Sequence, residues 1–275
     1  MTPLERLNWF WKTDNERISL VRDILVAFVV VMVILTSLWA YTGQWWTAPM
    51  VAIESGSMEH PEDSGFGRLG TIDAGDMVLV VKVDSFDDVI ARGGTYGGVL
   101  AQTDKDFYFY WDYGDVIIYK PMGDDDRSQI IHRAMCWVDV SFSGGERQYT
   151  IEDYGIYNET QLTIPELGLH KRAPEWDHDG FLTKGDNNAV IDQVSSICPQ
   201  PVKVEWITGK ARSEIPWLGT INLFFEDLMT GKNTVANVHQ DCLICLGLVI
   251  GLLVSIPVGL DVRDYVVERR KKQKE

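Results

Sequence analysis

Three short, separated segments of this sequence carry side chains that could act together in nucleophilic catalysis. They are Ser55-Gly56-Ser57-Met58, Ile130-Ile131-His132-Arg133 and Gly185-Asp186-Asn187-Asn188-Ala189-Val190-Ile191-Asp192. A serine hydroxyl is a weak nucleophile at neutral pH, so it needs a base within hydrogen-bond reach and a third group that orients this base. Serine, histidine and aspartate can fill these roles in any chain order. As bare residue types they are weak evidence, because each segment alone is more often a turn or a core strand.

The elements that must position these side chains read mainly as β-strands. Short β-branched runs bounded by glycine, proline and aspartate predict strands at 77–83, 115–119, 129–135 and 201–207. Turns are expected at the glycine pairs 93–94, 97–98 and 144–145. The pattern predicts a mainly β, antiparallel sheet domain, in which residues of about 137–180 could form an inserted subdomain. Apolar residues recur at near-helical spacing over 218–228, which favours either a helix on a membrane surface or a core element.

Two uncharged apolar runs flank this predicted domain. Residues 24–42 and 242–260 each contain 19 residues without a charged side chain, close to the ~20 that cross a bilayer as a helix. The first run is longer than the ~7 to 15 apolar residues of a cleaved signal peptide, and Trp45-Trp46 after it suit a membrane interface. Lysine and arginine are frequent in 1–23 and 261–275, so both termini are predicted to be cytoplasmic. Residues 43–241 would then form an extracytoplasmic domain of a two-span cell-membrane protein.

The charge of the segment between the two runs restricts its partners. Residues 43–241 contain 15 basic and 32 acidic residues, a formal charge of −17. Such a surface argues against nucleic acid as a partner, because phosphate binding requires lysine and arginine patches. It fits a halophile protein that is soluble at high salt, where charges are screened over a few ångströms, although an ordinary acidic domain would also show it.

Neither the cysteines nor the remaining histidines indicate a binding site for a cofactor or a metal ion. Cys136 and Cys198 could form a disulfide or stay as two buried thiols. The pair Cys242 and Cys245 has the spacing of a redox or metal-binding pair, but it begins the second apolar run and lacks partner ligands, so both are expected to be lipid-facing or packing residues. The other histidines have no motif around them and are predicted to be surface groups: His60, His170, His178 and His239.

In combination, the motifs resemble the type I signal peptidase family in its archaeal and endoplasmic-reticulum form. Besides the three segments above, the resemblance includes Gly75-Asp76-Met77-Val78 and Gly114-Asp115-Val116-Ile117-Ile118, and it covers roughly residues 50–207. It implies that Ser57 is the nucleophile, that His132 is the general base, and that Asp192 and Asp186 are the two family aspartates. Asp192 is the expected partner of the histidine. Ser55 would support the oxyanion together with the amide of Ser57.

The resemblance also implies a function and partners. The chain would be a membrane-bound serine endopeptidase that removes signal peptides from secretory preproteins, working at the lipid bilayer and near the protein translocation channel. The family usually has one residue between the Ser-Met pair and a proline, whereas this sequence has two, in Ser57-Met58-Glu59-His60-Pro61. It also contains long segments at 62–74, 84–114 and 137–180. A non-catalytic, membrane-anchored β-domain that binds extracellular ligands is the alternative. A self-cleaving, repressor-like peptidase is disfavoured by the two apolar runs and by histidine in place of lysine.

Overall fold

The computed structural model describes residues 2–13, 15–45, 47–60, 65–98 and 107–272. The chain divides into two compact units, Met1–Pro49 and Met50–Glu275. Trp46, Lys274 and parts of the expected insertions 62–74 and 84–114 lie outside the described residues, so the expectations that concern them stay untested.

Where the structure describes it, the first unit contains two helices, α1 (Pro3–Lys12) and α2 (Glu16–Thr42). Thr2 and Glu5 form a capping box at the start of α1, which satisfies backbone N–H groups that have no partner inside the helix. The side chain of Asn15 caps α2, and Gly43 ends it in a left-handed conformation with φ of 70°. The α2 helix is long and apolar enough to cross a membrane.

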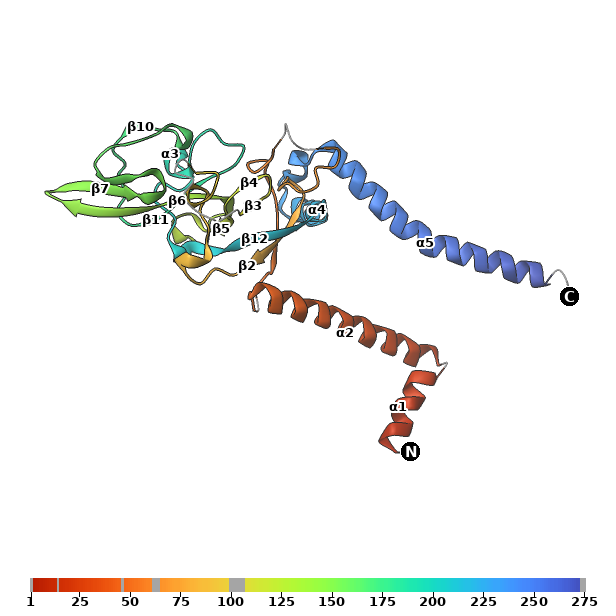
Figure 1. The fold of residues 1–275 in the computed structure, drawn as a ribbon. Coiled ribbons are helices and arrows are strands. Elements are labelled where there is room, and N and C mark those ends of the chain that lie inside the picture. The colour runs from red at the N-terminus through yellow and green to blue at the C-terminus, as the bar shows by residue number, and fades with distance from the viewer. Residues whose placement is uncertain (1, 14, 46, 61–64, 99–106, 273–275) are drawn as a thin grey trace. The chain divides into compact units, whose positions relative to one another are not determined.

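The second unit is built around one antiparallel sheet (Figure 1). In the described part of the chain, eight strands form this sheet in the order β1-β2-β12-β5-β6-β7-β8, with β11 paired to β6. Two small hairpins, β3–β4 and β9–β10, lie off it. The strands are β1 (Met50–Ala52), β2 (Met77–Val81), β3 (Tyr108–Phe109), β4 (Asp112–Tyr113), β5 (Val116–Tyr119), β6 (Ile130–Ser143), β7 (Glu146–Ile151), β8 (Ile156–Glu159), β9 (Leu162–Ile164), β10 (Leu169–Arg172), β11 (Gly180–Lys184) and β12 (Ile207–Ile215).

The mainly antiparallel sheet predicted from sequence is therefore present, but one of the four predicted strands is wrong. The runs at 77–83, 115–119 and 129–135 correspond to β2, β5 and β6. Residues 201–207 instead contain a 3-10 turn, Val204–Trp206, and the strand begins only at Ile207. In β12 every second residue is buried, at Ile207, Gly209 and Ala211. Because Gly209 and Ala211 are small, the sequence lacks the alternation of large apolar and polar residues that marks a strand.

The region predicted as an inserted subdomain continues the sheet. Strand β6 crosses position 137 without a break and turns at Gly144 and Gly145 into β7, as the glycine pair predicts. The glycine pair at 93–94 instead belongs to a 3-10 turn, Arg92–Gly94. The segment after β6 contributes most of a buried cluster around Trp176 and Tyr149, which also includes Leu182 and Ile191. Cys136 and Cys198 are buried, and all four cysteines are free.

The described residues of the second unit also form three α-helices: α3 (Asp192–Ser195), α4 (Gly219–Thr230) and α5 (Gln240–Lys272). The helical spacing over 218–228 is confirmed by α4, which buries only a narrow face with Thr220 and Leu223 and exposes its other large apolar residues. From Gln240 to Val267, α5 is long and apolar enough to cross a membrane. The chain thus has one apolar helix near each end.

Candidate active site

The candidate nucleophile lies in the segment that follows edge strand β1, residues 53–59, here called the serine loop. Ile53 fixes the start of the loop, because its N–H donates to the Asp76 carbonyl and its carbonyl accepts from the Gly75 N–H, both at 2.9 Å. Met58 is 1 % exposed and packs with Ile53 in the core. Ser57 is therefore held between two buried anchors, while its own side chain stays partly accessible.

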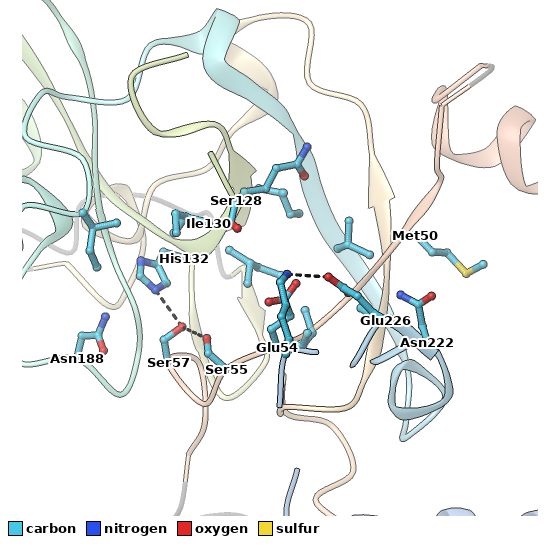
Figure 2. A pocket seen from close by; sticks show the side chains of 18 residues that line it. Met50, Glu54, Ser55, Ser57, Ser128, Ile130, His132, Asn188, Asn222 and Glu226 are labelled. Carbon is cyan, nitrogen blue, oxygen red and sulfur yellow. Dashed lines mark hydrogen bonds and ion pairs between the residues drawn. The ribbon is translucent and has the colours of Figure 1, made fainter. Parts of the chain in front are cut away.

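His132 lies on β6, opposite Ile117 of β5, and its residue is 3 % exposed. Its ring contacts both of the other predicted catalytic residues. The Nε2 atom lies 3.0 Å from Ser57 Oγ, and the Nδ1 atom lies 2.7 Å from Asp192 Oδ2 (Figure 2 shows the first contact). This arrangement fits a neutral imidazole whose Nδ1–H donates to the carboxylate, which leaves Nε2 free to accept the serine proton.

Asp192 is the first residue of α3 and is completely buried. Its Oδ2 atom also accepts hydrogen bonds from Tyr119 Oη and Thr183 Oγ1, each at 2.7 Å. Burial and the neighbouring Asp192 charge raise the pKa of Tyr119 well above its ordinary value, so this hydroxyl stays a donor at neutral pH. Two neutral hydroxyls thus hold the carboxylate in place against His132.

The Gly-Asp-Asn-Asn motif follows β11, whose last residue, Lys184, pairs with Arg133 next to His132. In this aspartate loop, residues 185–191, the Asn187 N–H donates to the Ser57 carbonyl at 2.9 Å and its side chain donates to the Gly56 carbonyl at 3.1 Å. A Cβ atom at Gly185 would lie 2.6 Å from the Ser57 carbonyl oxygen and 2.9 Å from His132 Nε2. Only glycine leaves room for the serine and the imidazole to meet here.

Asp186, the second predicted aspartate, contacts different groups. Its carboxylate accepts from Arg133 through Nε at 2.8 Å and Nη2 at 2.5 Å, and lies 2.9 Å from His60 Nε2. Arg133 is fully buried and its Nη1 also donates to the carbonyl of Gly114 at 2.9 Å. Burial would raise the pKa of Asp186, but the bonds from His60 and Arg133 outweigh it and lower that pKa. Asp186 is thus placed to organise the loops around the site.

His60 is not the surface group that the sequence predicts. Its side chain is only 16 % exposed and pairs with Asp186. The hydrogen bond to Asp186 outweighs burial and raises the pKa of His60 above its ordinary value of 6.5. The signal that could have revealed it is the departure from the family motif after Met58, which places a histidine three residues beyond the candidate nucleophile. Nothing in the local sequence, however, indicates a partner 126 positions away.

Ser55 and Gly56 complete the serine loop. The Oγ atom of Ser55 lies 3.4 Å from Ser57 Oγ, so its hydroxyl is close to the atom that would attack a substrate. Its role in binding an oxyanion stays a prediction. A Cβ atom at Gly56 would lie 2.6 Å from the Glu59 carboxyl group. The side chain of Glu59 therefore occupies the space beside this glycine.

A groove of about 740 Å³ opens beside these residues. One side is formed by β1 and the serine loop, and another by residues 128–132 at the start of β6. Asn222 and Glu226 of α4 also line it, together with Lys232, which donates to Glu226 at 2.7 Å (Figure 2). Among the described residues, no group of three or more histidine, cysteine, aspartate or glutamate side chains is placed to hold a metal ion.

Comparisons of the chain with models of known protein families and with curated proteins found no match.

Proposed function

We propose that this chain is a membrane-bound serine endopeptidase of the type I signal peptidase kind, which removes signal peptides from secretory preproteins. The observation that carries the proposal is the hydrogen-bonded series from Asp192 Oδ2 through His132 to Ser57 Oγ, with distances of 2.7 and 3.0 Å. A nucleophile, a base and a group that orients the base in this geometry are what acyl transfer requires.

The reaction that this arrangement favours has two stages. Ser57 Oγ attacks the carbonyl carbon of the scissile peptide while its proton passes to His132 Nε2, and His132 then gives this proton to the leaving amine. Water, activated by the same imidazole, hydrolyses the acyl ester and restores the serine. Asp192 would stabilise the imidazolium formed in each stage. Ser55 would donate to the oxyanion, and Ser55→Ala should lower kcat by about 10²- to 10³-fold.

An extended substrate suits the shape of the groove. Strand β1 is an edge strand that pairs only with β2 in the described sheet, and its residues line the groove that leads to Ser57. An edge strand offers unpaired backbone groups to an extended peptide. We infer that the residues preceding the scissile bond pair along β1, and that cleavage follows a small residue, because signal peptides end in an A-x-A-like pattern.

The membrane arrangement belongs to the same proposal. Two apolar helices, near the two ends of the chain, would anchor the enzyme with both termini in the cytoplasm and residues 43–241 outside. Protease added outside sealed cells should digest this segment and spare both tails. Digestion of the basic tail from outside would contradict the orientation.

Incubation of the full chain in detergent with a labelled preprotein tests the activity. Wild-type protein should release one product whose new N-terminus follows a small residue, and Ser57→Ala should release none. A folded wild-type protein that binds the preprotein without cutting it would favour the non-catalytic binding domain instead. Cleavage that consistently follows large or charged residues would contradict the substrate class.

A further inference from the structure

The residues just before the second apolar helix hold the serine loop at both of its ends. This junction, residues 237–241, ends with the first two residues of α5 and makes two side-chain contacts that bracket Ser57. Asn237 Nδ2 donates to the carbonyl of Glu54 at 2.8 Å, three positions before Ser57. His239 Nε2 lies 3.1 Å from Glu59 Oε2, two positions after it.

Glu59 connects the contact with His239 to the centre of the serine loop. The residue is 8 % exposed, and its carboxylate lies between His239 and Arg68, whose Nη1 is 3.8 Å away. The same carboxyl group fills the space beside Gly56, where a Cβ atom would come within 2.6 Å of it. Any displacement of Glu59 therefore changes the surroundings of the residue directly before Ser57.

The junction is itself fixed in the second unit, so it can act as a support. Val238 and Cys242 are buried with Leu223 of α4 in a small apolar cluster. Asp241 Oδ2 accepts from the N–H of Gly67 at 2.9 Å, and the carbonyl of Gly67 accepts from Trp217 Nε1 at 2.8 Å. These contacts anchor the junction to segments other than the serine loop.

We propose that Asn237 and His239 are positioning residues for Ser57. The segment that leads into the second apolar helix would then support the catalytic serine, while the helix itself would serve as a membrane anchor. The proposal rests on the proposed function for its effect on catalysis. A nucleophile must approach the reacting carbon at about 3 to 3.5 Å, and a misplacement of about 1 Å can lower a rate by about 10²-fold. Neither residue touches the reacting atoms, so their effect acts through the loop.

The test uses the full chain in detergent, with two readouts. Asn237→Asp replaces the donor by an acceptor that faces the Glu54 carbonyl, and His239→Ala removes the partner of Glu59. The double variant should lower kcat for a labelled preprotein by about tenfold, with KM changed less than twofold. It should also speed amide hydrogen exchange in residues 53–59. His239→Gln places an amide donor near the position of Nε2 and should restore most of the activity lost in His239→Ala.

Matched controls separate the proposal from general damage. Asn233→Ala, four residues before the junction, and Gln240→Ala, within it, change exposed side chains and should leave kcat and exchange unchanged. Unchanged exchange in 53–59 of the double variant would overturn the proposal whether or not the chain is a peptidase, and so would unchanged kcat. If exchange speeds up but wild-type protein cuts no preprotein, the support stands and the proposed function fails.

Discussion

Two histidine–aspartate pairs lie at this site, and they differ in what else their carboxylates contact. His132 pairs with Asp192, whose other hydrogen-bond donors in the described residues, Tyr119 and Thr183, are neutral hydroxyls. His60 pairs with Asp186, which also accepts two hydrogen bonds from the buried guanidinium of Arg133. The first histidine contacts Ser57.

The difference indicates separate tasks for the two pairs. The carboxylate of Asp186 is already paired with the buried guanidinium of Arg133, and His60 is its second partner. Asp192 has no such permanent cation among its described partners, so a proton that passed to His132 in the proposed reaction would meet a carboxylate without a paired cation. We infer that His132 would transfer the proton and that Asp192 would stabilise the resulting imidazolium, whereas His60, Asp186 and Arg133 hold the surrounding loops together.

Removing each imidazole should separate the two pairs most strongly. His132→Ala should lower kcat by about 10⁶-fold, the scale of losing the base of a serine peptidase, whereas His60→Ala should lower it by about tenfold or less because only loop position changes. Cleavage of a labelled preprotein by each variant checks this, with His178→Ala as a histidine control outside the site. Equal losses for His132→Ala and His60→Ala would break the comparison.

Neutralising each carboxylate should give opposite patterns in activity and stability. Asp192→Asn should cost about 10⁴-fold in kcat, because an amide no longer selects the reactive tautomer of His132. Asp186→Asn leaves the fully buried Arg133 without a counter-charge, which should lower the free energy of unfolding by about 3 to 5 kcal/mol. Urea unfolding and kcat, measured on both variants, test this. A larger stability loss in Asp192→Asn than in Asp186→Asn would reverse the assignment.

The His60–Asp186 pair should also give stability a pH dependence. The raised pKa of His60 means that its contribution is complete below about pH 6.5 and is lost as the pH rises through the folded-state value. The lowered pKa of Asp186 means that its contribution is present above about pH 4 and is lost as the pH falls through its folded-state value. The difference in Tm between wild type and His60→Ala should therefore be greater at pH 5.5 than at pH 9. A difference that grows toward pH 9 would contradict this sign.

The sequence could predict those parts of the site that depend on local pattern. The β-branched runs located β2, β5 and β6, and the motifs selected Ser57, His132 and Asp192 as a set. The sequence predicts a strand at 201–207, where the structure has a 3-10 turn, and it does not reveal β12, because Gly209 and Ala211 interrupt the alternation of large apolar and polar side chains. The contact between His60 and Asp186 joins residues 126 positions apart. The contact between His239 and Glu59 joins residues 180 positions apart. No local pattern encodes such contacts, since they arise from the way the sheet brings loops together.

The central claim is that His132, and not His60, activates the side chain at position 57. A cysteine at this position reports it without any substrate, because only the thiolate reacts with iodoacetamide, and an ordinary thiol is a few per cent thiolate at pH 7. Alkylation of Ser57→Cys in the full chain, followed by peptide mass spectrometry, should slow by about tenfold when His132→Ala is added and should change little when His60→Ala is added. An alkylation rate that is the same with and without His132 would contradict the account.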